Sequence, residues 1–378
     1  MHAPITVREI SSTRDKKAFI QHLWDVYRTD ENWIPPLMMD RLKLIDEKRN
    51  PFFQHAKAKW FVAEENGKIV GRIGAIVNDN YIELHQEKTG WFGFFESRHS
   101  QDVANKLFEA AETWLRSQGM TKVLGPANPS SNDEFGLLVE GFDRPPVMIM
   151  TYNPRYYGEL IEHAGYSKAK DLYAYLISQK TSRTPKLERV VRALQERSHI
   201  TVRAFDPKHF DREVALIKQI YNKAWEKNWG FVPFTDAEID FLAKDLKQIY
   251  DPSVILFAEQ NGETVGFSLS LPDINQAFKA GRRIPKGMMN LPVGALSLIS
   301  KKKHIDTLRI IVLGVLPQLR GRGIDALLYW ETMERALEKG YMFGEASWVL
   351  EDNEPMNRAA QLMQGQRYKT YRIYQKQL

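Results

Sequence analysis

The sequence predicts an α/β protein built from two tandem copies of one domain. A chain of 378 residues is long enough for two domains of ordinary size. Three short patterns recur in the second half at an offset of 195 or 196, which indicates a duplicated domain of about 190 residues. The patterns are Ile-Thr-Val-Arg at 5–8 and 200–203, Ala-Glu-x-Asn-Gly-x-x-Val-Gly at 63–71 and 258–266, and Asn-Trp at 32–33 and 228–229.

Each copy shows the same order of predicted elements. A short strand and a helix come first, and an Asn-Gly dipeptide then joins two apolar runs, the strongest short-range signal for a β-hairpin. An apolar strand, an amphipathic helix that stops at Gly119 or Gly340, a further strand, a last helix and a Tyr-rich strand complete the copy. The expected ranges are 6–10 and 201–205 for the first strand, 16–27 and 211–225 for the helix, 60–77 and 254–271 for the hairpin, 121–124 and 346–350 for the further strand, and 172–177 and 371–375 for the last strand.

We predict domains at residues 1–180 and 185–378. Residues 179–184 are the expected linker, and apolar periodicity over 185–198 predicts a helix that bridges the halves. The second copy has about 26 extra residues within 273–306, because the offset grows from 195 to 221 after the hairpin. This apolar and basic insertion fits a lid or a substrate wall, and equally a surface excursion that packs on the other domain.

The stretch from Leu308 to Gly340 has the strongest functional signal. A run of β-branched residues ends at Val315 and predicts a buried strand. Gly321 and Gly323 then remove side chains from a tight turn that feeds an amphipathic helix. Unpaired N–H groups and the positive end of the helix dipole favour an anion at such a turn, and two neighbouring arginines add positive charge.

Gln318-Leu319-Arg320-Gly321-Arg322-Gly323, preceded by Val315 and Pro317, resembles the Gln/Arg-x-x-Gly-x-Gly/Ala pyrophosphate loop of the GNAT acyltransferase superfamily. The element order also resembles the GNAT fold, which implies a mixed, mostly antiparallel sheet flanked by helices in each copy. The resemblance implies acetyl-CoA or another acyl-CoA as cosubstrate and no metal. The cosubstrate residues that it implies are Val315, Gln318, Leu319, Arg320, Gly321, Arg322, Gly323, Ile324 and Asn353, the last of which also reads as a helix N-cap.

The first copy has replaced both glycines of this loop. At an offset of 221, Gln318–Gly323 align with Ser97–Asp102, and neither glycine is kept. Side chains at these positions crowd the close approach that a pyrophosphate needs. We therefore expect a degenerate first copy and a second copy that binds CoA.

Acyl transfer to an amine needs a polarised carbonyl, a path for the amine proton and an acid for the leaving thiolate. The resemblance implies carbonyl contact near Leu313–Val315. It also implies a tyrosine acid on the last helix, which has none here, so Tyr368 or Tyr371 is the substitute unless both pack in the final strand. Glu345, Glu351, Asp306 and His304 are candidate bases or solvated strand ends, and we select Glu345 and Tyr368 as the catalytic pair.

Two further segments are candidates for the acceptor site. The long segment 125–157 of the first copy is polar at its start, and Asn132, Asp133 and Glu134 there are our candidates to receive an amine. The alternative is a loop that stabilises the seam between the domains. Trp229 belongs to an aromatic group with Trp225, Phe231 and Phe234, which either lines the acceptor groove or forms core.

Composition narrows the functional classes. The chain has no cysteine, which excludes disulfides and thiolate chemistry, and no apolar run of membrane-spanning length. The N-terminus lacks a signal-peptide pattern, and the net charge of +6 is spread without a basic stripe. We expect a soluble, cytoplasmic N-acyltransferase without nucleic-acid or membrane partners that transfers an acyl group, expected to be acetyl, directly to a small amine. The alternatives are a non-catalytic CoA-binding or structural module and an aminoacyl-transferring relative.

Overall fold

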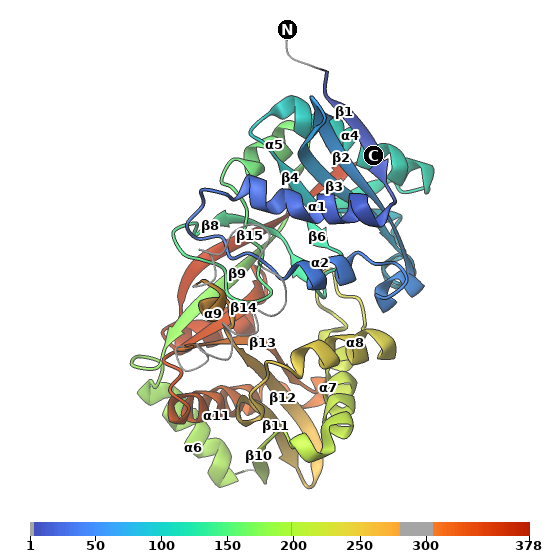
Figure 1. Cartoon of the computed structure of the whole chain (residues 1–378). Coiled ribbons are helices and arrows are strands. Elements are labelled where there is room, and N and C mark those ends of the chain that lie inside the picture. Colours follow the sequence, from blue (N-terminus) through green and yellow to red (C-terminus); the bar gives the residue numbers. More distant parts are fainter. Residues whose placement is uncertain (1–3, 198, 280–304) are drawn as a thin grey trace. The chain divides into compact units, whose positions relative to one another are not determined.

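The computed structural model describes residues 4–197, 199–279 and 305–378 (Figure 1). The chain divides into two compact units. Of the described residues, unit 1 contains 4–171, 278–279 and 370–378, and unit 2 contains 172–197, 199–277 and 305–369. Most of the insertion that we predicted as a lid or wall, residues 280–304, lies outside the described residues.

Unit 1 is built on a mixed, mostly antiparallel sheet. Neighbouring strands from β1 to β4 are antiparallel, β4 and β5 are parallel, and the end of β15 adds antiparallel to β5. The small strands β6 and β7 pair with each other, and β8 pairs with β15. The bounds are β1 (Thr6–Ile10), β2 (Ala56–Glu65), β3 (Lys68–Asn78), β4 (Thr89–Ser97), β5 (Lys122–Gly125), β6 (Ala127–Asn128), β7 (Glu134–Phe135), β8 (Leu137–Glu140) and β15 (Gln366–Gln377).

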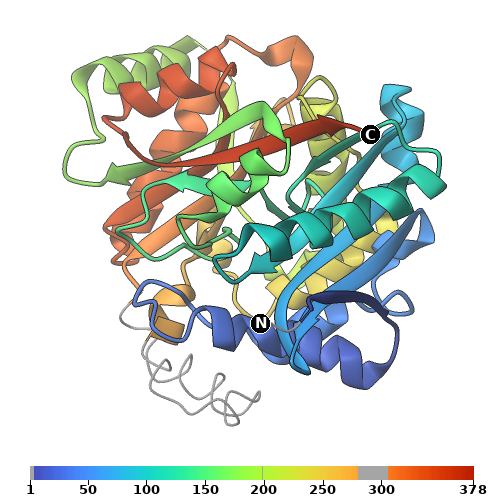
Figure 2. The same ribbon diagram turned by 90° about the horizontal axis from the view of Figure 1, so that it is seen from above.

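Helices cover both faces of this sheet, and Figure 2 shows α4 along the strands of unit 1. Trp60 and Phe61 are adjacent on β2 and therefore point to opposite faces. Trp60 contacts Phe19 of α1, whereas Phe61 packs in a core cluster with Leu107 of α4. The bounds are α1 (Thr13–Val26), α2 (Met38–Leu44), α3 (Asp79–His85), α4 (Gln101–Ser117), α5 (Tyr157–His163) and the 3-10 turn η1 (Pro51–Gln54).

Unit 2 repeats this arrangement. Neighbouring strands from β10 to β13 are antiparallel, β13 and β14 are parallel, and the end of β9 adds antiparallel to β14. Leu256 packs with α11 on one face, and Phe257 packs with α7 on the other. The strands are β9 (Ser167–Ser178), β10 (Ile200–Ala204), β11 (Ile255–Gln260), β12 (Glu263–Pro272), β13 (Thr307–Val315) and β14 (Phe343–Leu350). The helices are α6 (Pro185–Arg197), α7 (Phe210–Trp225), α8 (Asp236–Leu246), α9 (Asn275–Lys279), α11 (Ile324–Glu338) and α12 (Glu354–Leu362), with the 3-10 turns η2 (Pro207–His209), η3 (Pro252–Val254) and η6 (Pro317–Leu319).

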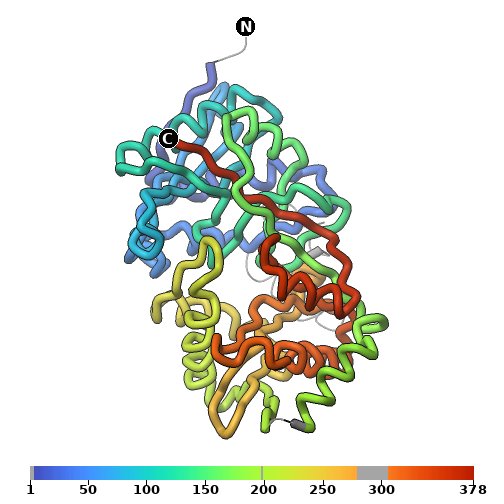
Figure 3. The backbone as a smooth tube through the Cα atoms, turned by 180° about the vertical axis from the view of Figure 1, so that it is seen from behind, coloured from blue at the N-terminus to red at the C-terminus, as the bar shows by residue number. Residues whose placement is uncertain are grey.

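The final strand of each sheet comes from the other copy of the repeat. In unit 1, Tyr374 of β15 lies opposite Gly125 of β5. In unit 2, β9 from the end of the first copy pairs with β14, so that Leu172 lies opposite Leu350. Figure 3 shows the C-terminal end of the chain, in red, among segments of the first copy. The two copies therefore exchange their last strands.

The predicted fold class is confirmed, and so are both Asn-Gly hairpins. Asn66 and Gly67 have φ values of 52° and 72°, and Asn261 and Gly262 have 52° and 81°. Positive φ at both central residues is what a two-residue type I′ turn requires. The helix expected over 185–198 is α6. The division at 1–180 and 185–378 describes the repeat in the sequence and stays a prediction.

Candidate functional site

The strand before the glycine turn separates from its parallel neighbour partway along its length. β13 pairs with β14 from Thr307 opposite Phe343 to Ile310 opposite Ala346, and no later residue of β13 pairs with β14 in the described chain. Against β12, the register shifts between Ile310 and Val312, which makes Ile311 the extra residue of a bulge. After Ile310, β13 therefore has no paired residue of β14 beside it in the described chain.

Burial shows the same feature. On β13, Ile310, Ile311, Val312 and Leu313 are all half-buried, although they are large apolar residues of an inner strand. Every residue of β4, the corresponding strand of unit 1, is buried. Unit 2 thus has an accessible apolar strip, defined here as residues 310–313, which unit 1 lacks.

In unit 1 the corresponding space is filled by the segment after β5. The side-chain oxygen Oδ1 of Asn128 accepts the N–H of Phe94 at 2.6 Å. A Cβ built on Gly93 would lie 1.8 Å from the carbonyl oxygen of Ala127. The N–H of Phe94 on β4 is therefore hydrogen-bonded within the chain. The carbonyl group of Ala127 leaves no room for a ligand atom beside Gly93.

The glycine turn occupies residues 316–323, between β13 and α11. Gly321 and Gly323 have φ values of 72° and 85°, which favour glycine. Space is open around Gly321, where an added Cβ would meet nothing within 4 Å. Gly323 is the N-cap of α11 and offers no side chain to the N–H groups of the first turn. These groups are available to an anion.

The structure corrects the register that we used to compare the two copies. Unit 1 has only residues 98–100 between β4 and α4. Gly71 lies opposite Ser97, while its repeat equivalent Gly266 lies opposite Val315, so these strands correspond at an offset of 218 rather than 221. The first copy therefore lacks the glycine turn as a segment, rather than carrying substitutions within it.

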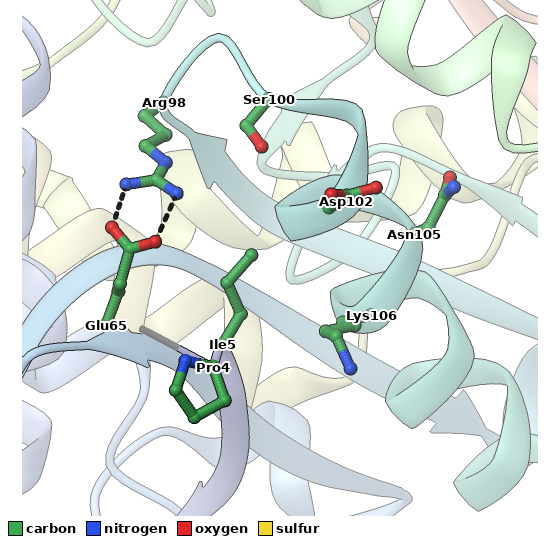
Figure 4. A pocket seen from close by; sticks show the side chains of 8 residues that line it. All are labelled: Pro4, Ile5, Glu65, Arg98, Ser100, Asp102, Asn105 and Lys106. Atoms are coloured by element: carbon green, nitrogen blue, oxygen red, sulfur yellow. Dashed lines mark hydrogen bonds and ion pairs between the residues drawn. The ribbon is translucent and has the colours of Figure 1, made fainter. Parts of the chain in front are cut away.

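The short turn of unit 1 borders a pocket of about 610 Å³ (Figure 4). Arg98 in this turn forms a two-pronged ion pair with Glu65, in which Nη2 lies 2.9 Å from Oε1. This pairing compensates the charge of Arg98, and the other charged residues of the lining, Asp102 and Lys106, have opposite charges, so the pocket has no excess of positive charge to attract phosphate. Its lining residues are Pro4, Ile5, Glu65, Arg98, Ser100, Asp102, Asn105 and Lys106.

The predicted cosubstrate residues of the turn differ in exposure. Gln318, Arg320, Gly321 and Arg322 are exposed, Leu319 and Gly323 are half-buried, and Val315 and Ile324 are buried. Helix α6 lies beside this turn, because a Cβ on Gly323 would be 3.5 Å from Val190 and 3.9 Å from Leu194. The turn thus has open space at Gly321, whereas α6 packs against it at Gly323.

Asn353 acts as an N-cap in the structure. Its side chain accepts the N–H of Met356 at 3.3 Å at the start of α12. This geometry satisfies one of the unpaired donors of the helix. Contact with CoA stays a prediction for this residue.

Glu345 and Tyr368 lie together inside unit 2. The hydroxyl of Tyr368 donates to Oε1 of Glu345 at 3.4 Å, and Ser347 donates to Oε2 at 2.8 Å. Glu345 has 0% exposed surface, whereas Tyr368 is half-buried. A proton from Glu345 would therefore reach a substrate through Tyr368. The structure brings the two selected residues together, and their catalytic role stays a prediction.

Buried cations accompany this carboxyl group. Arg309 Nε lies 3.9 Å from Oε2 of Glu345, and Lys369 is also buried. Burial raises the pKa of the Glu345 carboxyl group above its ordinary value, and Arg309 and the hydrogen bonds from Ser347 and Tyr368 oppose this effect only in part. Sequence reasoning missed Arg309, Ser347 and Lys369. The available signal was a charged residue inside an apolar strand, which calls for a buried partner.

Asp306, another candidate base, has structural contacts. Asp306 accepts Gln276 Nε2 at 2.7 Å and Thr307 Oγ1 at 2.8 Å. Glu351 is half-buried just after β14, and His304 lies outside the described residues. Tyr371 is fully buried in β15 within unit 1, so packing explains its place.

The predicted acceptor residues fall in different units. Glu134 of unit 1 forms an ion pair with Arg41 and accepts Asn128 Nδ2 at 3.4 Å. Asp133 accepts the hydroxyl of Ser130 at 2.6 Å, which also accepts the N–H of Asn132 at 3.1 Å. These contacts stabilise the segment after β5, which occupies the space beside Gly93 and Phe94 of β4. Trp229 belongs to unit 2 and is half-buried in the turn after α7.

The aromatic cluster of unit 2, defined as Tyr221, Trp225, Phe231 and Phe234, is centred on α7. Tyr221 stacks on Trp225 with ring centroids 5.0 Å apart, and lies 5.8 Å from Phe231 and 5.3 Å from Phe234. Phe231 is buried, while the other three are half-buried. The cluster is therefore partly core and partly surface.

Within residues 4–197, 199–279 and 305–378, no group of three or more His, Asp or Glu side chains is arranged to hold a metal ion. No helix in that same part of the chain has the length and apolar character needed to cross a bilayer.

Comparison with known sequences identifies the family. Residues 18–133, in the first copy, match the acetyltransferase (GNAT) family. The chain is 38% identical to a protein named bacterial ceramide synthase from Caulobacter vibrioides, in an alignment that covers 100% of this chain and 98% of the relative. It is 35% identical to protein YghO of Escherichia coli, with 98% and 95% covered.

Comparison with solved structures supports the fold. A tandem GNAT protein from the clavulanic acid biosynthesis pathway matches with a TM-score of 0.59 and 11% identity over 99% of this chain and 98% of that chain. A GCN5-related N-acetyltransferase from Sphaerobacter thermophilus matches with a TM-score of 0.54 and 14% identity over 99% and 96%. Given these matches and the relatives that align along its whole length, the chain belongs to the GNAT acyltransferase family and is an N-acyltransferase.

Proposed function

We propose that this protein joins a fatty acyl group from acyl-CoA to the amino group of a long-chain amine, with CoA bound by unit 2. The observation that carries the proposal is the 38% identity, along the whole chain, to a relative named ceramide synthase. A ceramide is the amide of a long-chain amino alcohol and a fatty acid, so the acceptor class would be an amino lipid. This differs from our expectation of acetyl transfer to a small amine, which the experiment below also tests.

The contrast between the two units supports CoA binding in unit 2. The turn at 316–323 has two glycines with positive φ, open space at Gly321 and a helix N-terminus without a side-chain cap. These features favour a pyrophosphate. Unit 1 has a shorter turn, a compensated Arg98 and a filled β4 space.

Apolar side chains support a long acyl chain and a long-chain acceptor. The strip 310–313 on β13 remains half-buried, and three aromatic residues of the cluster on α7 are also half-buried. Burial of apolar surface is worth about 25 cal/mol per Å², so an alkyl chain that covers such side chains gains affinity that an acetyl group cannot. Trp229 of unit 2 remains our candidate for contact with the acceptor. The acceptor role of Asn132, Asp133 and Glu134, which lie in unit 1, stays a prediction.

The chemistry is a direct transfer. The amine nitrogen forms a bond to the carbonyl carbon, the carbon–sulfur bond breaks, and the thiolate leaves with that electron pair. An ammonium substrate gives up two protons overall, one to the thiolate and one to solvent. We assign proton donation to the hydroxyl of Tyr368, with Glu345 behind it as the group that exchanges protons with this hydroxyl. Backbone N–H groups of 313–315 are the candidates to polarise the carbonyl.

The test is a grid of substrates with the purified full-length protein. Acetyl-CoA and palmitoyl-CoA are each combined with ethanolamine, a polyamine and the long-chain amino alcohol sphinganine, and free thiol release is measured with mass spectrometry of the amide. We expect thiol release and amide only with palmitoyl-CoA and sphinganine. Turnover of acetyl-CoA with a small amine would support the earlier expectation instead. No thiol release with any pair would overturn both.

A further inference from the structure

The side chain of Arg320 binds the end of helix α7. Its Nη2 donates to the carbonyl oxygen of Ala224, in the last turn of that helix. The final carbonyls of a helix have no partner within it and form the negative end of the dipole, so a cation there is a favourable cap. The next carbonyl, of Trp225, accepts the N–H of Asn228 at 2.8 Å. Arg320 therefore ties the glycine turn to α7.

Helix α7 in turn places Trp225 directly on β13. A Cβ built on Gly314 would lie 2.5 Å from Cζ3 of Trp225, so the indole rests on the strand backbone with no space between them. The same indole stacks on Tyr221 of the aromatic cluster. A shift of the last turn of α7 would thus move both the surface against Gly314 and the cluster.

Arg322 provides an internal comparison. It carries the same charge two residues further along, between Gly321 and Gly323, and its side chain is exposed. One arginine of the turn is anchored to a neighbouring helix, and the other lies at the open part of the turn. Equal charges with different contacts indicate different roles.

We propose that Arg320 is a positioning residue that couples the two substrate sites of unit 2. A phosphate bound to the turn would restrict the backbone torsions of Gly321 and Gly323, which a missing side chain leaves less restricted than those of other residues. Arg320 then holds Ala224 and Trp225 in place, so bound CoA orders the aromatic cluster that receives the amine. Arg322 supplies attraction to the phosphates. This inference rests on the proposed function, because it takes CoA to bind at the turn and the amine at the cluster.

The experiment compares the full-length wild type with Arg320→Gln, Arg320→Lys and Arg322→Gln. Hydrogen exchange of peptides that span residues 217–234 is measured with and without CoA, and CoA affinity is measured by calorimetry at two salt concentrations. In the wild type we expect CoA to slow exchange in these peptides. Arg320→Gln loses this protection with a small change in CoA affinity, and Arg320→Lys regains part of it. Arg322→Gln keeps the protection but binds CoA several-fold more weakly, with a reduced dependence on salt.

Kinetics provide the second readout. Arg320→Gln should raise the KM for the amine by about 5-fold or more and change the KM for acyl-CoA little, while Arg322→Gln should show the reverse. If the two glutamine variants behave alike in both readouts, the coupling role is overturned and the proposed function stands. If the wild type does not bind CoA at all, the proposed function falls and the coupling role falls with it.

Discussion

The hydroxyl of Tyr368 lies 3.4 Å from Oε1 of Glu345, a carboxyl group with 0% exposed surface. Ser347 holds the other carboxyl oxygen at 2.8 Å, which leaves Oε1 directed to the tyrosine. Only Tyr368 of this pair has exposed surface. We therefore expect this pair to pass a proton between the buried carboxyl group and a substrate.

Replacing Tyr368 with Phe should lower kcat by about 10²–10³-fold and leave the KM for acyl-CoA nearly unchanged, because a proton donor is lost and binding surface is kept. Steady-state kinetics with thiol detection measures this. The matched control is Tyr341→Phe, which breaks another tyrosine–carboxylate hydrogen bond of unit 2, to Asp251 at 3.3 Å, and should leave kcat unchanged. Equal losses in both variants would contradict the assignment.

Stability should depend on pH through Glu345. Because burial raises the pKa of this carboxyl group in the folded state, its contribution is fully present below the unfolded pKa and is lost as pH rises through the folded pKa. The free energy of unfolding of the wild type should thus fall relative to Glu345→Gln as pH rises from about 4.5 towards neutral. Urea denaturation at several pH values measures the difference. Ser347→Ala removes a donor that lowers this pKa, and should extend the loss to higher pH. A pH-independent difference would contradict this account.

Gly314→Ala should damage unit 2, because the new Cβ would lie 2.5 Å from the ring of Trp225. We expect a loss of about 1–3 kcal/mol in stability together with reduced activity. Gly344→Ala is the control, since its Cβ would meet only Ile310 Cδ1 at 3.8 Å, an ordinary contact. Chemical denaturation measures the stability of both variants, and steady-state kinetics measures their activity. Wild-type stability and activity in Gly314→Ala would show that Trp225 moves to make room for the new Cβ.

Asn128→Ala should destabilise unit 1 without altering CoA affinity. The variant removes the acceptor of the Phe94 N–H, and an unpaired buried donor costs about 1–3 kcal/mol. If unit 2 holds the cosubstrate, calorimetry with CoA should give the wild-type dissociation constant. A markedly weaker or stronger CoA affinity would indicate that the β4 space of unit 1 takes part in binding.

Local patterns in the sequence were sufficient for much of the fold. Asn-Gly between apolar runs predicts both hairpins, and Gly321 and Gly323 predict a tight turn before a helix, because these signals depend on neighbouring residues alone. The contact between Glu345 and Tyr368 was not predictable, since it joins two strands through the folded sheet. The offset of 221 was wrong for the strands before the turn, because the first copy is shorter at this turn and has no residues there to align with those of the second copy. Arg320 was expected only at the ligand, and its contact with Ala224 depends on where α7 ends.

Strand exchange has a consequence for how this gene can be divided. A fragment cut between the repeats would leave the first copy without the β15 residues that pair with β5, and the second copy without β9 beside β14. Each fragment would then expose an open sheet edge, which is prone to aggregate. We therefore expect either half, expressed alone, to aggregate unless another strand covers this edge. Each copy thus depends on the other for the last strand of its sheet, even though one copy lacks the glycine turn.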